Sequence, residues 1–181
     1  MTDPVTSPNI SFRPIDMGDV ETLRAWLDAP HVRRWWRDDR TDAVVSAAEA
    51  GVPVDGAWMT EIDGEPLGYI RGYPALSNPG GFWDGVENVT DHTMALDYLI
   101  GPPDMMNRKF GRAMIRAFVT RLFEDPAVDR IVADPARDNW PANIALKRIG
   151  FRDRGAIGKP GVNAMLLTLA RGVDNGIAKH R

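Results

Sequence analysis

The sequence predicts a single domain in which strands and helices are mixed around a sheet, of the α/β or α+β class. Two β-rich runs flank an Asp63-Gly64 pair, which is the strongest short-range signal for an antiparallel hairpin. Other segments carry apolar residues at helical spacing, and no repeat or linker divides the chain. A length of 181 residues suits one domain with a sizeable core.

The N-terminal part is expected to hold one strand and two helices. Residues 10–13 have a strand pattern, and Asp16 then offers a side-chain oxygen that can cap a helix. Pro30 is expected to end this helix. Its buried stripe is formed by Val20, Leu23, Trp26 and Leu27. A second short helix is predicted over residues 41–50.

The middle of the chain combines the hairpin with an irregular loop. The hairpin strands are predicted over residues 57–62 and 65–73. The loop at residues 77–91 is rich in Gly, Asn, Pro and Asp, and it also holds aromatic and acidic side chains. Such a loop is more often a binding loop than a connector, with a plain surface loop as the alternative.

The second half alternates strands with helices. Strands are expected over residues 93–100, 130–133, from 151 onward and over 164–169, and helices over 111–123 and 139–150. A turn at residues 101–104 precedes the first of these helices. Asn139 is expected to cap the second helix and Gly150 to end it. Asp97 is the anomaly of its strand, because a carboxylate among apolar residues is costly to desolvate unless it is paired or used.

The composition excludes several classes of function. A formal net charge of -3 argues against a nucleic-acid or membrane partner. The absence of cysteine excludes disulfides, thiolate metal sites and a cysteine nucleophile, and the three histidines are too scattered to predict a metal site. No stretch approaches the about 18 apolar residues of a membrane span, and the N-terminus has no apolar signal region. We therefore expect a cytoplasmic protein.

Several short motifs follow one another in a characteristic order. They are Trp35-Trp36, Gly64-Glu65-Pro66-Leu67-Gly68-Tyr69, Phe82-Trp83-Asp84, Asp97 in its strand, Leu122-Phe123-Glu124-Asp125-Pro126, Asp134-Pro135, and Asn139-Trp140-Pro141-Ala142 through Arg148-Ile149-Gly150-Phe151. In this order and spacing the chain resembles the GNAT superfamily. Within it, the chain is most similar to the aminoglycoside 6'-N-acetyltransferases and the siderophore lysine N-acyltransferases.

The resemblance implies an α+β fold, with a mixed, largely antiparallel sheet flanked by helices. It implies one acyltransferase domain at residues 11–170, between a flexible N-terminus at 1–10 and a loose C-terminal tail at 171–181. The enzyme would be an N-acetyltransferase that uses acetyl-CoA and no metal. Its partner would be a small-molecule amine, and the protein would be a monomer or a homodimer.

The resemblance also assigns residues to acetyl-CoA. The backbone of Tyr98, Leu99 and Ile100 would pair with the pantetheine arm, and Asn139 would hydrogen-bond to it. The pyrophosphate loop would comprise Asn107, Arg108, Lys109, Phe110, Gly111 and Arg112. The family pattern there is Arg or Gln, two residues, Gly, one residue, and Gly or Ala, and residues 106–111 keep only the last glycine. Arg108 and Lys109 bring positive charge that can bind phosphate directly, with a solvated turn as the alternative.

Asp97 is the candidate catalytic base. A protonated amine must lose a proton before it attacks a thioester, which requires a carboxylate or histidine within reach. The aminoglycoside branch carries aspartate at this position and the siderophore branch histidine, and a salt bridge to Arg71 is the structural alternative. Leu146 stands where many relatives have a tyrosine that protonates the leaving thiolate. Either Tyr98 or water then takes that role, or protonation does not limit the rate.

The resemblance implies an acceptor side as well. Its candidate residues are Trp36 and Trp83 as apolar walls, Asp84 and Glu87 as loop acids, and Asp134 as a second carboxylate for the amine. The structural alternatives are core packing for the tryptophans, solvation for the loop acids, and a turn before Pro135 for Asp134.

The predicted acceptor is an aminoglycoside-like amine. A siderophore lysine N-acyltransferase with a longer acyl chain is the alternative enzyme, which residues 99–104 favour. A non-catalytic acyl-CoA sensor or interaction module is the alternative of another class, because the phosphate loop is altered and the tyrosine is missing.

Overall fold

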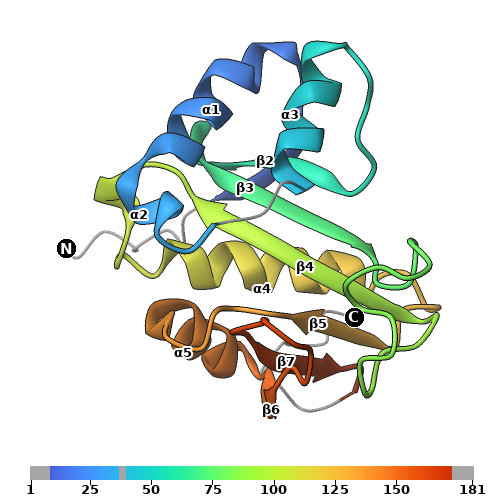
Figure 1. Ribbon diagram of the computed structural model, residues 1–181. Coiled ribbons are helices and arrows are strands. Elements are labelled where there is room, and N and C mark those ends of the chain that lie inside the picture. The colour runs from blue at the N-terminus through green and yellow to red at the C-terminus, as the bar shows by residue number, and fades with distance from the viewer. Residues whose placement is uncertain (1–8, 37–39, 173–181) are drawn as a thin grey trace.

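A single seven-stranded sheet forms the centre of the protein, in the strand order β1-β2-β3-β4-β5-β7-β6 (Figure 1). The computed structural model describes residues 9–36 and 40–172. The strands are β1 Ile10–Pro14, β2 Ala57–Ile62, β3 Glu65–Pro74, β4 Thr93–Ile100, β5 Arg130–Ala133, β6 Arg152–Ala156 and β7 Met165–Ala170. Neighbouring strands are antiparallel except β4 and β5, which are parallel. This is the mixed, largely antiparallel α+β fold that the resemblance implies.

Helices cover both faces of the sheet. The α-helices are α1 Val20–Asp28, α2 Pro30–Arg33, α3 Arg40–Glu49, α4 Phe110–Leu122 and α5 Trp140–Ile149, and two short 3-10 helices are η1 Met17–Asp19 and η2 Pro103–Met105. In Figure 1, α1 and α3 lie on one side of β2–β4 and α4 lies on the other. A large core of buried side chains from the sheet, α4 and α5 fills the α4 side. A second core joins α1, α2 and α3 to β2, β3 and β4.

Local chemistry explains why the predicted elements form. The hairpin is confirmed, because Asp63 and Gly64 both take positive φ angles, 51° and 88°, as a two-residue turn between twisted strands requires. The helix after Asn139 is also confirmed. The side chain of Asn139 accepts a hydrogen bond from the amide of Ala142, and Gly150 ends the helix with a φ of 117°.

The predicted first helix is divided in the structure into the 3-10 helix η1 and the α-helix α1. Asp16 does cap a helix, but it caps η1, through a capping box with Asp19, and α1 follows directly. Pro30 does not only follow the end of α1; it occupies the first turn of α2, where a missing N–H costs nothing.

The predicted ends of the domain fall mostly outside the described residues. Within them, Ile10 already belongs to β1. Arg171 is still held, because its guanidinium donates hydrogen bonds to the carbonyls of Val128 and Phe123, each at 2.8 Å. Ile10 is thus part of a strand and Arg171 is held by hydrogen bonds, while the flexible N-terminus at 1–10, the single domain at 11–170 and the loose tail at 171–181 stay predictions.

The sheet opens between its two central strands. β4 pairs with β5 at three positions only, which join Thr93–Ala95 to Arg130–Val132. β4 remains paired with β3 along its whole length, out to Ile100. From Leu96 onward, the edge of β4 that faces β5 therefore leaves the ladder.

Candidate active site

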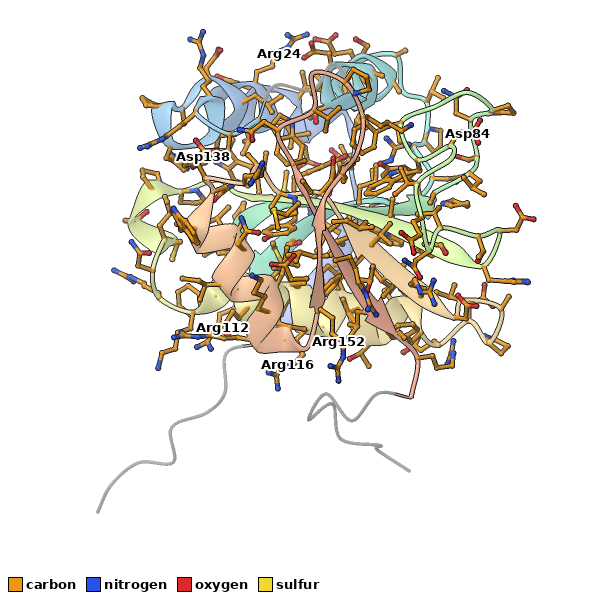
Figure 2. The ribbon with its side chains drawn as sticks, turned by 60° about the horizontal axis from the view of Figure 1, so that its bottom comes forward. Arg24, Asp84, Arg112, Arg116, Asp138 and Arg152 are labelled. Carbon is orange, nitrogen blue, oxygen red and sulfur yellow. The ribbon has the colours of Figure 1, made fainter. Side chains whose placement is uncertain are left out.

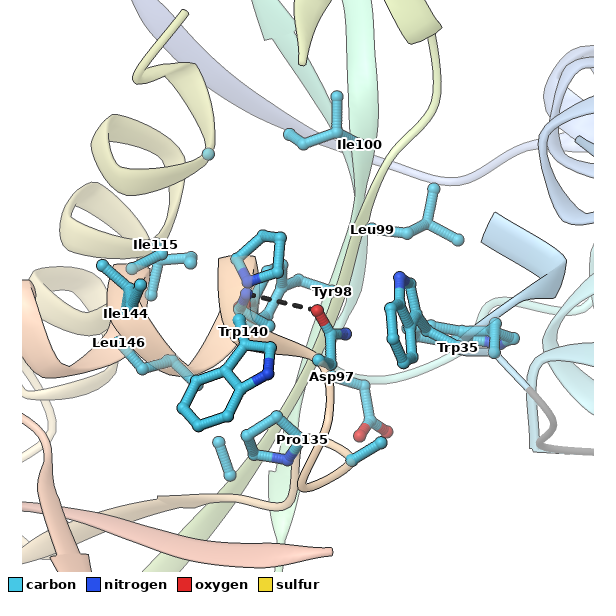
Figure 3. Close-up of a pocket in the computed structure, with 18 of the residues that line it drawn as sticks. Trp35, Asp97, Tyr98, Leu99, Ile100, Ile115, Pro135, Trp140, Ile144 and Leu146 are labelled. Atoms are coloured by element: carbon cyan, nitrogen blue, oxygen red, sulfur yellow. Dashed lines mark hydrogen bonds between the residues drawn. The ribbon is translucent and has the colours of Figure 1, made fainter. Parts of the chain in front are cut away.

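A cavity of about 1120 Å³ occupies the opening between β4 and β5. Pockets for one small ligand commonly measure about 300–1,000 Å³, so this cavity has room for a cofactor-sized molecule together with a second substrate. Figure 3 shows Leu99 and Ile100 along β4, with Trp140, Ile144 and Leu146 on one side and Trp35 on the other. The cavity thus passes between α5 and the segment that follows α2.

Eleven of the sixteen residues proposed from the sequence line this cavity. They are Trp36, Asp97, Tyr98, Leu99, Ile100, Asn107, Lys109, Gly111, Arg112, Asp134 and Asn139. They come from the segment after α2, from β4, from the start of α4 and from the connection between β5 and α5. Residues far apart in the sequence are therefore gathered at one place in the fold.

Both candidate carboxylates of the reaction face the same cavity. Asp97 is half-buried in β4, and Asp134 is half-buried directly after β5. Arg71 on β3 lies opposite Asp97 in the register, so the two side chains share one face of the sheet. The guanidinium of Arg71 also lies over the ring of Tyr73, at 4.8 Å. Asp97 thus contributes negative charge inside the cavity and lies beside a cation.

The start of α4 gives the cavity a positively charged end. Lys109 is the N-cap of α4 and takes a left-handed conformation with a φ of 68°, which is the kind of backbone that glycine adopts at lowest cost. The first amides of the helix are therefore presented as they would be with glycine, and a helix N-terminus favours anions. The side chains of Lys109 and Arg112 line the cavity, as does Arg148 from α5. Arg112 and Arg116 lie along one side of the molecule in Figure 2.

Two asparagines hold the connection between β5 and α5. Asn139 caps the helix as described. Asn143, which the sequence analysis missed, is 4% exposed and donates hydrogen bonds to the carbonyls of Ala136 and Asn139, both at 2.9 Å. The sequence did offer a signal for it: a polar residue on an apolar helix face, one turn after the capping Asn139, indicates a side chain that hydrogen-bonds to nearby backbone. Asn143 therefore fixes the loop that carries Asp134.

Aromatic side chains form the walls of the other end. Trp36 donates its indole N–H to Thr41 Oγ1 at 2.7 Å and packs edge-on against Tyr69. Trp35 and Phe82 also line the cavity, together with Trp140, whose side chain is 67% exposed. Large apolar side chains exposed to a cavity are available to contact a ligand.

Five proposed residues do not line the cavity. They are Trp83, Asp84, Glu87, Arg108 and Phe110. Trp83 is 2% exposed and belongs to a buried cluster under the loop, and its indole N–H donates to the hydroxyl of Tyr73 at 3.2 Å. Trp83 therefore packs in the core, which is the structural alternative named for it above. The neighbouring Phe82 lines the cavity instead.

The loop acids and Arg108 point to solvent. Asp84 and Glu87 are exposed, Asp84 accepts a hydrogen bond from the amide of Gly80, and it lies at the periphery in Figure 2. Arg108 is exposed as well, and Phe110, the first residue of α4, packs against the core. Among the predicted phosphate-loop residues, Asn107, Lys109, Gly111 and Arg112 thus line the cavity, and Lys109 and Arg112 are the cations among them.

The structure also bears on the source of a proton for the leaving group. Leu146 lines the cavity and is fully buried, and it has no proton to donate. The hydroxyl oxygen of Tyr98 is buried and makes no hydrogen bond within the described part of the chain, and burial raises the pKa of Tyr98 far above its usual value. A tyrosine with so high a pKa is a poor acid at neutral pH, which leaves water as the other donor among the alternatives.

Across residues 9–36 and 40–172, no group of three or more His, Asp or Glu side chains is arranged to hold a metal ion. In the same residues, every helix is too short or too polar to cross a bilayer.

The split sheet, the cationic helix start and the carboxylate-bearing strand together define an enzyme that transfers acetyl groups to nitrogen. The chain belongs to the acetyltransferase (GNAT) domain family, whose model matches residues 16–158. It is 26% identical over 180 residues to aminoglycoside N(6')-acetyltransferase type 1 of Klebsiella pneumoniae, covering 92% of this chain and 87% of that protein.

Solved structures show the same similarity. The structure of the aminoglycoside acetyltransferase AAC(6')-Ib in complex with ribostamycin and coenzyme A has a TM-score of 0.77 and 26% identity, over 90% of this chain and 94% of that one. A protein of uncharacterised function from Bacillus halodurans has a TM-score of 0.81 at 22% identity, over 98% of this chain and 92% of that one, and it supports the fold alone. The predicted family and fold class are thereby confirmed.

Proposed function

We propose that this protein transfers the acetyl group of acetyl-CoA to a primary amine of an aminoglycoside-like acceptor, with Asp97 as the base. The observation that carries the proposal is a single cavity that contains the open edge of β4, the N-terminus of α4 and the carboxylates of Asp97 and Asp134. The named substrates of relatives, aminoglycosides and coenzyme A, support the assignment.

The cofactor half of the cavity fits an extended amide chain that ends in phosphates. Alternate residues of β4 turn their backbone groups away from β3, toward the open edge, and can pair with amides as an added strand does. The diphosphate would meet the first amides of α4 and the side chains of Lys109 and Arg112.

In the reaction, the Asp97 carboxylate would take a proton from the acceptor ammonium, directly or through one water. The neutral nitrogen then forms a bond to the thioester carbon while the carbon–sulfur bond breaks. As the amide forms, its nitrogen releases a second proton to water, and the products are an amide and a thiolate. The thiolate takes up a proton from water, because Leu146 has none to donate and the hydroxyl of Tyr98 is buried. Asp134 would hold the acceptor by charge.

The test replaces Asp97 with Asn and measures thioester consumption over a panel of amines. We expect Asp97→Asn to retain acetyl-CoA binding and to lose turnover by roughly 10²- to 10⁴-fold, which is the usual contribution of a positioned base. Asp84→Asn is the matched control, because that exposed carboxylate lies outside the cavity. A folded Asp97→Asn protein with wild-type kcat would remove Asp97 from the mechanism and make Asp134 the next candidate.

The same panel separates the alternatives. Preference for longer acyl donors and hydroxylysine-like amines would transfer the assignment to the siderophore branch. Binding of acetyl-CoA without turnover of any amine would favour the sensor. The cytoplasmic location and the choice between monomer and homodimer stay predictions.

A further inference from the structure

His31 links α2 to the open edge of β4. Its Nε2 lies 3.1 Å from the carbonyl oxygen of Ile100, 69 residues further along the chain, and the contact is partly buried. A carbonyl only accepts hydrogen bonds, so the ring must carry a proton on Nε2 and donate it. His31 also lines the cavity.

The direction of the Ile100 carbonyl shows which edge His31 occupies. The amide of Gly101 donates to Leu67 O on β3 at 3.0 Å. The peptide unit between Ile100 and Gly101 is trans, as are all peptide bonds of the described residues, so the carbonyl of Ile100 points the opposite way from the Gly101 amide. His31 therefore bonds to the edge of β4 that is released from β5, the edge that would hold the cofactor.

The turn that follows α2 carries two aromatic residues of the cavity, Trp35 and Trp36, which together are called the acceptor wall. The amides of Trp35 and Trp36 both donate to Val32 O, at 2.9 and 2.8 Å, so these residues extend the turn that begins with Pro30. Val32, Trp35 and Trp36 line the cavity. A side chain that fixes α2 to β4 thus also fixes the aromatic wall relative to the strand of the base.

We infer that His31 is a positioning residue for the acceptor. Its hydrogen bond to the Ile100 carbonyl holds the acceptor wall against β4 and couples the position of that wall to cofactor binding at the open edge of β4. The inference rests on the proposed function. A side-chain hydrogen bond to a neutral carbonyl has a modest net effect, so His31→Ala should raise the acceptor KM about twofold to tenfold. The kcat at saturating acceptor should change much less, because Asp97 stays in place.

The experiment compares His31→Ala, His31→Gln and Arg33→Ala. Glutamine keeps an N–H donor, so His31→Gln should recover most of the acceptor affinity. Arg33 is exposed on the same helix and does not line the cavity, so Arg33→Ala should behave as wild type. Steady-state kinetics give KM and kcat, and thermal melting checks that each variant is folded.

Amide hydrogen exchange over residues 31–36 supplies a readout that needs no turnover. His31→Ala should speed exchange there. Because the Ile100 carbonyl has two lone pairs, it can accept from His31 and from the cofactor together, so acetyl-CoA should protect this segment in wild type more than in His31→Ala. Unchanged KM and unchanged exchange in His31→Ala would overturn the inference, as would equal impairment of His31→Gln and His31→Ala. Absence of turnover by wild type would instead refute the proposed function, and the exchange experiment would still decide whether His31 anchors α2.

Discussion

Replacing Lys109 with glycine should make the ligand-free protein more stable. A non-glycine residue in the left-handed region costs about 1–2 kcal/mol, and Lys109 has a φ of 68° and no side-chain cap hydrogen bond. Glycine also destabilises the fold by about 0.4–1 kcal/mol, because it raises the conformational entropy of the unfolded chain. The net gain of about 0.5–1 kcal/mol corresponds to a rise in Tm of about 1–4 °C for a chain of this size.

Thermal melting with and without acetyl-CoA measures both effects of the substitution. Lys109→Gly also removes a cation from the cavity, so the Tm increase produced by acetyl-CoA should be smaller than in wild type. Lys109→Met separates the two effects, because it removes the charge and keeps the left-handed strain. It should not raise the Tm of the free protein, and it should weaken the response to the ligand.

The neighbouring Arg108 provides a control of opposite sign. Arg108 does not have a positive φ, so Arg108→Gly adds unfolded-state entropy without relieving strain and should lower the Tm. A Lys109→Gly protein with a Tm below that of wild type would refute the reasoning, because the substitution would then act like Arg108→Gly.

Three further predictions concern buried polar groups. Tyr98→Phe removes a buried hydroxyl without a partner in the described structure, so urea unfolding should show unchanged or higher stability, by up to about 1–3 kcal/mol, and a large loss of stability would contradict this. Asn143→Ala leaves the Ala136 carbonyl without its side-chain donor and should cost about 1–3 kcal/mol in the same measurement; a neutral effect would show that the loop is held by other contacts. Burial is the largest influence on the pKa of Asp19 and would raise it, but the hydrogen bonds from Arg13, the hydrogen bond from the Asp16 amide and the charge of Arg13 together lower it. The contribution of Asp19 to stability is therefore present above a pH of about 3.9 and is lost as the pH falls through the folded pKa. Acid titration of unfolding should therefore show a smaller acid loss in Asp19→Asn than in wild type, and parallel curves would exclude Asp19 as a source.

Short-range chemistry was sufficient to predict most of the elements. The hairpin turn, the Asn139 cap and the Gly150 stop each depend on a few adjacent residues, and each is found where predicted. The sequence pattern predicts Pro30 only as the end of a helix, although the same missing N–H that ends one helix is harmless at the start of the next.

The composition of the cavity was less accessible to sequence reasoning. Trp83 and Phe82 are adjacent and both aromatic, and only the path of the loop decides that Trp83 is buried while Phe82 faces the cavity. Likewise, nothing local connects His31 to Ile100 across 69 residues. At Lys109 the residue type misleads, because the backbone keeps a glycine-like conformation although the glycine of the family pattern is absent.

The narrow junction between β4 and β5 has a consequence for how the chain folds. The pairs β1–β2, β2–β3 and β3–β4 lie within the first 100 residues, and β5–β7 and β6–β7 lie within the last 50 or so described residues. Each half can thus complete its own ladder from contacts that are comparatively near in sequence, which favours rapid formation. During synthesis the first half emerges earlier, and its α4-facing side stays uncovered until the helix between the halves follows. Docking of α4, and not strand pairing, is therefore the step expected to unite the two halves.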